Sequence, residues 1–287
     1  MIQTLRRSWP GVPWVAPTVV LLLALSIYPL VYSVKVSLTG PAGFSMANYT
    51  RLVQDQLFLQ ALAQTMLYTA VALAIEFVLG FALALLIDSL GRGRAFFRAG
   101  LLAPMLLPPV VVAVIWRLIY NPQFGVLNGT LRSLGMNTSA LTWTSGEGGA
   151  LASVILVDVW EWTPFLFLVL SAGLQALPHE PLEAARMDGA SSWQVFRDVV
   201  LPLLKPVMTL AILLRTMDLM RIFDQIFILT QGGPGFATET VSLYIYRTAF
   251  RFFNFGYAAA MSFLGLGLTI VFARSLMRLM RVPRVSK

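Results

Sequence analysis

Apolar residues are concentrated in six blocks of the chain, and polar stretches separate each block from the next. A helix that crosses a bilayer needs about 20 mainly apolar residues, and every block reaches about that length. The pattern therefore predicts an all-α integral membrane protein with six transmembrane helices. The predicted spans are residues 14–34, 62–87, 99–119, 150–177, 206–229 and 257–277.

The composition supports this prediction. Hydrophobic residues make up 57% of the 287 residues and charged residues only 12%, which is too little charge to cover a soluble domain of this size. No internal repeat or soluble domain is evident, so we expect one transmembrane domain over residues 1–287. Arg6 and Arg7 precede the first span as in a signal peptide. That span is longer than a signal's apolar core and lacks a small-residue cleavage site, so we expect it to remain as an anchor.

Prolines and turn-forming residues refine the prediction in three segments. The third span contains Pro104, Pro108 and Pro109, so we expect a kinked helix there. The segments 120–149 and 230–256 contain Asn, Gly, Thr and Pro and are predicted to be loops.

Basic residues predict the orientation, because cytoplasmic segments of membrane proteins carry an excess of Lys and Arg. Alternate segments, starting with the N-terminus, contain 13 of the 21 Lys and Arg residues. Both termini and the segment 178–205 are therefore expected in the cytoplasm. The net charge of +8 reflects this asymmetry and not a nucleic-acid partner. The 13 residues are Arg6, Arg7, Arg92, Arg94, Arg98, Arg186, Arg197, Lys205, Arg274, Arg278, Arg281, Arg284 and Lys287.

Several kinds of chemistry are excluded by residue usage. The chain has no Cys and a single His, His179, which argues against a disulfide framework, a Cys-ligated metal, a thiol nucleophile and a His-based metal site or triad. The phosphate-binding pattern GxxxxGK[ST] does not occur in the sequence. We therefore expect a protein that is not an enzyme and binds no metal or ATP itself.

The polar segment EAARMDGASSWQVFRDVVLPLLKP, residues 183–206, lies between the fourth and fifth spans. Gly189 stands where a helix C′ residue adopts positive φ, and Ser191 or Ser192 can cap a following helix. Leu201-Pro202 is then expected to turn the chain back toward the membrane. The prediction is two short helices at the cytoplasmic surface, joined by a sharp bend.

This segment resembles the EAA loop of the membrane subunits of binding-protein-dependent ABC importers, the type I permease fold. The matching residues are Glu183, Ala184, Ala185, Asp188, Gly189, Ala190, Phe196, Leu201, Pro202 and Pro206.

The resemblance implies a coupling helix that sits in a cleft of an ATPase subunit. Glu183 would face a basic residue of the ATPase, Gly189 would allow the bend, and apolar side chains would anchor the helix. The implied partners are two ABC ATPase subunits that bind ATP and Mg, a second homologous permease and an extracytoplasmic solute-binding protein. The implied location is the cytoplasmic (inner) membrane of a bacterium or archaeon.

Three further stretches resemble the carbohydrate branch, whose members include maltose, trehalose and glycerol-3-phosphate permeases. They are LLLALSIYPLVYSVKVSL, VWEWTPFLFLVLSAGLQALP and RIFDQIFILTQGGPGFATETVSLYIYRTAF. The resemblance implies import of a di- or oligosaccharide, trehalose or a maltose-like sugar first. A polyol or glycerol-3-phosphate is the alternative within the family.

Ionisable residues inside the predicted spans are costly, so they suggest functional sites. Glu76 lies in span two, and Asp158 and Glu161 share a face of span four. Span five carries four charges at three-residue spacing, which form a slow spiral of alternating sign with a net charge of zero. They are Arg215, Asp218, Arg221 and Asp224.

Two interpretations of these charges stay open. They could form a self-neutralising network that locks helices together, or they could line a path and bond sugar hydroxyls. Trp162 and Phe165 stand beside the acids and could stack on sugar rings, whereas Trp160 is expected to serve in packing. An ion-coupled secondary transporter would also use buried acids, but such folds usually contain repeats and have no use for an EAA loop.

Overall fold

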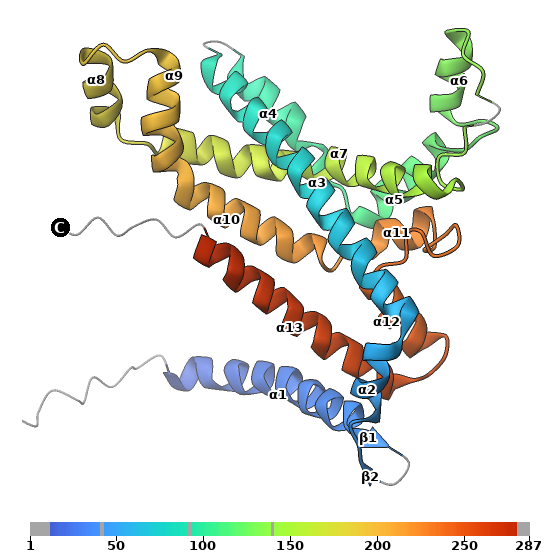
Figure 1. Cartoon of the computed structure of the whole chain (residues 1–287). Helices are drawn as coiled ribbons and strands as arrows, with labels where there is room; N and C mark the ends of the chain where they lie inside the picture. The colour runs from blue at the N-terminus through green and yellow to red at the C-terminus, as the bar shows by residue number, and fades with distance from the viewer. Residues whose placement is uncertain (1–11, 41–42, 91–92, 139–140, 280–287) are drawn as a thin grey trace, which may run out of the picture. The chain divides into compact units, whose positions relative to one another are not determined.

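The computed structural model describes residues 12–40, 43–90, 93–138 and 141–279 (Figure 1). The described part of the chain is almost entirely helical, as predicted. It divides into two compact units, one formed up to Gln54 together with Ile245–Leu264 and one formed by Asp55–Tyr244 and the residues from Gly265 on. Six basic residues used in the orientation argument lie outside the described residues: Arg6, Arg7, Arg92, Arg281, Arg284 and Lys287.

The first unit is built around α1 (Val12–Ser37) and α2 (Ala47–Gln54), which the two-residue strands β1 (Thr39–Gly40) and β2 (Gly43–Phe44) connect. Ser37 Oγ lies 2.9 Å from the hydroxyl of Tyr49 in α2, which ties the two helices together. No residue in the apolar stretch of α1 is buried within the described protein, as expected of a helix whose surroundings are lipid or other chains.

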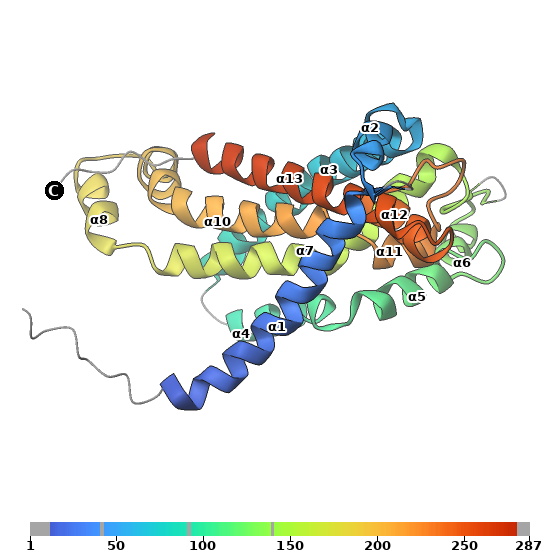
Figure 2. The ribbon, with the colours of Figure 1, turned by 90° about the horizontal axis from the view of Figure 1, so that it is seen from below.

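The core of the second unit lies where three long helices pack together: α3 (Gln56–Ser89), α7 (Glu147–Gln175) and α10 (Leu201–Leu219). Figures 1 and 2 show them side by side. Gly80 permits the close approach of α3 to α7, because a Cβ there would lie 2.9 Å from the Cβ of Leu166. Gly173 does the same between α7 and α10, where a Cβ would lie 2.8 Å from Leu204 Cδ1.

The third predicted span is not one kinked helix, so that prediction was wrong. The segment divides into α4 (Arg94–Leu102), the 3-10 turn η1 (Pro104–Leu106) and α5 (Pro109–Ile119). Three prolines within six residues remove three backbone donors, and Leu107 and Pro108 adopt extended conformations. Five other helices of the described residues are long and apolar enough to cross a membrane.

The fifth predicted span begins earlier than expected, at Ser192, and ends at Leu229 as predicted, although α10 itself ends at Leu219. A continuous helical segment runs through α9 (Ser192–Val195), the π-helical turn η2 (Phe196–Val200) and α10. The expected turn at Leu201-Pro202 is therefore absent. The N–H of Leu201 bonds to the carbonyl of Phe196, and this wider turn lets the helix continue past Pro202, which has no N–H to donate.

The two segments predicted to be loops also contain helices. Residues 120–149 include α6 (Val126–Ser133), and residues 230–256 include α12 (Val241–Phe250). The sixth predicted span is α13 (Phe255–Leu279), and the short helix α11 (Asp224–Leu229) follows α10.

Candidate functional site

The bend between the fourth and fifth predicted spans is a helix end of defined geometry. Helix α8 (His179–Met187) is followed by Gly189 at φ +81°. The N–H of Gly189 bonds to the carbonyl of Arg186, and the N–H of Ala190 bonds to that of Ala185. This pair of bonds is the Schellman motif, in which the C′ residue takes positive φ. Gly189 therefore has the conformation that the sequence predicted.

The next helix begins immediately after this bend. Ser191 accepts a bond from the N–H of Gln194, and the Gln194 side chain accepts one from the N–H of Ser191, which completes a capping box. Figure 1 shows α8 and α9 together at one end of α10. The bend thus joins two capped helices and fixes the direction in which α8 leaves α10.

The surface of this segment combines acidic and large apolar side chains. Glu183 and Asp188 are exposed, Met187 is 88% exposed and Trp193 is 64% exposed. Phe196 differs from these, because its ring lies 6.0 Å from that of Phe81 on α3. Phe196 therefore anchors the helix to its own core. It is not an exposed anchor of the kind that the resemblance implied.

A buried polar cluster lies in the second unit, centred on Arg215 of α10. Its Nε and Nη2 donate to the two carboxylate oxygens of Glu76 on α3, at 2.7 and 2.9 Å. The same guanidinium also pairs with Asp158 of α7 and with Asp218 one turn further along α10. Glu76, Asp158 and Arg215 are almost completely inaccessible, whereas the Asp218 side chain is half exposed.

A second chain of hydrogen bonds extends the cluster toward α11. Gln225 Nε2 donates to Glu161 Oε2 at 2.6 Å, and the hydroxyl of Tyr68 donates to Gln225 Oε1 at 3.4 Å. All three side chains are buried. Sequence reasoning missed Tyr68 and Gln225. The spacing of Tyr68, two turns before Glu76 on one helix, was the available signal.

Aromatic side chains border the cluster as the sequence suggested. The Arg215 guanidinium carbon lies 5.1 Å from the centre of the Trp162 ring, and Phe165 packs edge-on against Trp162. Trp160 faces elsewhere: it is 41% exposed and contacts Trp116 of α5. The role of Trp160 in packing stays a prediction, supported by its edge-on contact with Trp116.

The predicted charge spiral of span five is only half present. Helix α10 ends at Leu219, so Arg221 and Asp224 do not continue the face that carries Arg215 and Asp218. Arg221 is exposed and donates to the carbonyl of Met217, and Asp224 begins α11. Within the described ranges, neither residue forms an ion pair.

The cluster contains more acids than bases. It has three buried carboxylates, Glu76, Asp158 and Glu161, and one buried guanidinium, Arg215, which pairs with the first two. Asp158 Oδ1 and Glu161 Oε1 are buried and have no hydrogen-bond partner within the described part of the chain. Two acceptor atoms therefore lack a donor among the residues that the structure describes. Among the described residues, no group of three acidic or His side chains is arranged to hold a metal.

Comparison with solved structures identifies the fold. A chain of a bacterial ABC transporter involved in the import of the acidic polysaccharide alginate has a TM-score of 0.85, with 21% identity over 98% of this chain and 97% of that one. The same type of transporter in complex with its alginate-pentasaccharide-bound periplasmic protein has a TM-score of 0.83 at 20% identity, over 96% of this chain and 95% of that one. The chain has the fold of ABC importer permeases.

Comparison with curated proteins agrees with this result. A probable ABC transporter permease of Sinorhizobium fredii, y4oQ, is 41% identical over 85% of this chain and 81% of its own length. The trehalose/maltose transport system permease MalF of Thermococcus litoralis is 36% identical, over 88% and 85%. The trehalose transport system permease SugA of Mycobacterium tuberculosis is also 36% identical, over 90% and 84%.

The family match covers most of the segment analysed above, from Glu76 of the buried cluster through the bend to the end of α13. It extends over residues 76–282, more than half of the chain. The chain therefore belongs to the family of binding-protein-dependent transport system inner membrane components, as its EAA-like segment predicted.

Proposed function

We propose that this chain is the permease subunit of an ATP-driven importer of a neutral di- or oligosaccharide, with trehalose and maltose-like sugars as the first candidates. The names of two relatives, a trehalose/maltose permease and a trehalose permease, support this substrate class. In the proposed assembly a second permease completes the path. Two ATPase subunits bind ATP and Mg, and a solute-binding protein delivers the sugar. Both termini and the α8–α9 segment face the cytoplasm, as the basic residues predict.

One observation carries the mechanism: the α8–α9 bend and the buried cluster are connected by uninterrupted helix. Ser192 and Arg215 lie on the same continuous segment, α9–η2–α10. At 1.5 Å per residue they are about 35 Å apart along the axis. Pro206 lies inside α10 without ending it, so in this proposal a displacement of the bend is passed to Arg215 along one helical segment.

The residues of the bend have separate roles in this proposal. Glu183 is exposed on α8 and is available to pair with a basic residue of the ATPase. Ala184, Ala185 and Ala190 keep the surface flat enough for close contact. Asp188 and Gly189 form the bend. Phe196, Leu201 and Pro202 connect it to the core.

The buried cluster supports a neutral substrate. Asp158 Oδ1 and Glu161 Oε1 need hydrogen-bond donors, which sugar hydroxyls supply, and the ring faces of Trp162 and Phe165 suit the apolar faces of a sugar. The cluster carries an excess of carboxylates over Arg215 and the half-exposed Asp218 adds another, so a phosphorylated or acidic substrate would be repelled. Within the family, these features favour sugars and polyols over glycerol-3-phosphate.

The first test is co-purification. We expect the tagged chain, extracted in mild detergent from cells that express its neighbouring genes, to bring with it a P-loop ATPase and a second permease. Reconstituted vesicles containing ATP should then take up trehalose or maltose only when the solute-binding protein is present. A chain that purifies alone and moves solute without ATP would show that it is a secondary transporter.

A matched pair of variants tests the coupling role. Glu183→Ala should abolish uptake and the sugar-stimulated part of ATP hydrolysis, while the chain remains in the membrane. Glu180→Ala removes an exposed acid from the first turn of the same helix and should leave both activities near the wild-type level. Equal behaviour of the two variants would contradict the assignment of Glu183.

A further inference from the structure

The two oxygens of the Glu161 carboxylate have different surroundings, although the whole side chain is buried. Oε2 accepts from Gln225 Nε2 at 2.6 Å, whereas Oε1 has no hydrogen-bond partner among the residues of the described ranges. A buried acceptor in this state lowers stability, because it has lost its bonds to water and gained none within the protein. Buried polar groups that serve packing alone are normally satisfied. The bare oxygen therefore points to a ligand.

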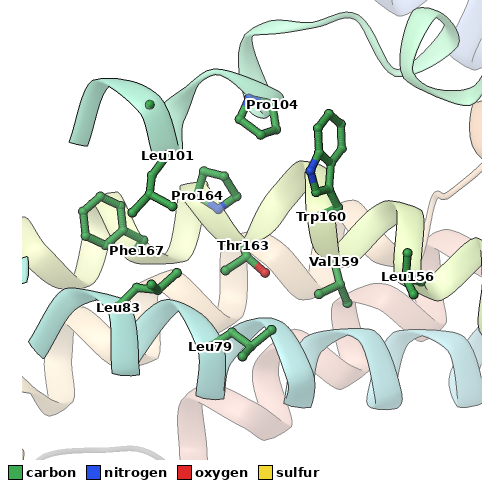
Figure 3. Close-up of a pocket in the computed structure, with 11 residues that line it drawn as sticks. Leu79, Leu83, Leu101, Pro104, Leu156, Val159, Trp160, Thr163, Pro164 and Phe167 are labelled. Atoms are coloured by element: carbon green, nitrogen blue, oxygen red, sulfur yellow. The ribbon is translucent and has the colours of Figure 1, made fainter. Parts of the chain in front are cut away.

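The bare oxygen lies on the polar side of α7 and not on its apolar side. Figure 3 shows the apolar side, where Leu156 and Trp160 line a pocket of about 550 Å³ together with residues of α3 and α4. None of the residues that line this pocket is charged. Glu161 shares its side of the helix with Asp158 and Trp162, the residues that border Arg215.

Gln225 is itself held in one orientation by a third helix. The hydroxyl of Tyr68 on α3 donates to Gln225 Oε1 at 3.4 Å, a longer bond than the one to Glu161. A carboxylate only accepts, so the amide turns its nitrogen toward Glu161 and its oxygen toward Tyr68. Half a turn of the amide would place oxygen against oxygen. The orientation of the Glu161 carboxylate is thus fixed from α3 through Gln225.

The course of the chain brings Gln225 to this place. Residues 192–229 are long and apolar enough to form one span, but α10 ends at Leu219 and α11 begins at Asp224. Interrupted helices of this kind form substrate sites in membrane transporters. The neighbouring Ile226 is apolar and completely buried. Burial of α11 therefore does not depend on Gln225, and an amide at this position serves another purpose.

From these contacts we infer that Gln225 is a positioning residue that determines substrate specificity. It holds Glu161 Oε2, so that Oε1 accepts from one hydroxyl of the sugar. The inference rests on the proposed function, because the ligand of Oε1 is the di- or oligosaccharide proposed above. Without the amide of Gln225, the carboxylate can rotate about its last carbon–carbon bond and no longer presents one oxygen in a fixed direction.

Sugar binding to the permease tests this inference. Radiolabelled trehalose and maltose are dialysed to equilibrium against the full-length chain in detergent, with the subunits that copurify and without the solute-binding protein. Gln225→Met removes the amide and keeps a side chain of similar length. We expect the Kd of the better-bound sugar to rise about fivefold, which corresponds to about 1 kcal/mol. Gln60→Met, at an exposed position of α3, should leave the Kd unchanged.

A double-mutant cycle separates positioning from packing. Glu161→Gln should raise the Kd about tenfold, because Gln225 holds the new carbonyl and an NH₂ group then stands where Oε1 accepted. In that background Gln225→Met should cause no further rise, since the two residues act through one bond. A second fivefold rise in the double variant would overturn the inference, and so would an unchanged Kd in Gln225→Met alone.

A second variant covers a failure of the methionine variant to assemble. Gln225→Asn keeps an amide in the buried site but shortens its reach by one carbon, so it should raise the Kd to a similar extent. If Glu161→Gln weakens binding and neither Gln225 variant does, the inference fails and the proposed function stands. Uptake without any binding to the permease would also overturn the inference alone. A wild-type complex that neither binds nor takes up either sugar would overturn both.

Discussion

Arg215 and Glu76, 139 residues apart in the chain, form a two-point ion pair in which both nitrogen–oxygen distances are below 3 Å and both side chains are almost fully buried. The fork of a guanidinium matches the two oxygens of a carboxylate, so the pair fixes α10 against α3 in one register. Asp158 binds the same guanidinium from α7. A single arginine therefore connects the three core helices.

Replacement of Arg215 should lower the free energy of unfolding. Arg215→Met leaves Glu76 and Asp158 buried without a cation, and we expect the free energy of unfolding to fall by about 3–5 kcal/mol. Arg221→Met serves as the control, because Arg221 is exposed, and its effect should stay within about 0.5 kcal/mol. Urea unfolding in detergent measures both. Equal stability of the two variants would show that the ion pair does not hold the core.

Glu161→Gln should separate stability from transport. The substitution removes a buried charge that has no cation of its own, and the new amide oxygen can still accept from Gln225, so the unfolding midpoint should not fall. A charge-assisted bond to a sugar hydroxyl is lost, and the KM for uptake should rise about tenfold. Uptake in vesicles and thermal unfolding are measured together, with Glu180→Gln as the control. Unchanged uptake would exclude Glu161 from the substrate path.

Gly189→Ala should loosen the bend without a steric clash. A Cβ at this position meets no atom within 4 Å, but positive φ costs an alanine about 1–2 kcal/mol. The N–H groups of residues 189 and 190, which close the end of α8, should therefore exchange with solvent about 5–30 times faster, as measured by hydrogen exchange. Gly189→Asn should show a smaller increase, because Asn tolerates positive φ better. Identical rates in all three proteins would mean that this conformation is not strained.

Gly80→Ala should disturb the contact between α3 and α7. The added Cβ would lie 2.9 Å from the Cβ of Leu166 and 3.0 Å from the backbone nitrogen of Phe167, so the helices must move apart, at a cost of about 1–3 kcal/mol in unfolding free energy. Gly267→Ala on α13 meets no atom within 4 Å and should be neutral or stabilising by up to about 1 kcal/mol. Thermal unfolding compares the two. A stabilising Gly80→Ala would show that the helices have room to adjust.

Local chemistry was sufficient to predict the bend and part of the cluster. The residues around Gly189 predict a helix end at this position. A helix end favours positive φ, which glycine adopts without a Cβ penalty. Asp158 and Glu161 are three residues apart on one helix, so their common face was predictable from spacing. The sequence left open a self-neutralising network of charges, and in the structure Arg215 pairs with Asp158.

Helix ends inside the membrane region were not predictable in the same way. No proline or glycine marks the end of α10 at Leu219, and the chain leaves the helix where Gln225 bonds to Glu161 and Tyr68, residues 64 and 157 positions away. Such distant contacts leave no trace in a local pattern. At Pro202 the sequence predicted a break in the helix that the structure does not have. The π-helical turn before Pro202 lets the helix continue.

The uninterrupted helix from Ser192 to Arg215 also constrains how this protein can change over generations. Each residue added to or removed from that segment would rotate Arg215 by about 100° relative to the bend, and so away from Glu76. Exposed side chains along the segment can vary, but the number of residues in it cannot. Insertions and deletions in related permeases should therefore fall outside residues 192–215, and the spacing between the bend and Arg215 should be kept.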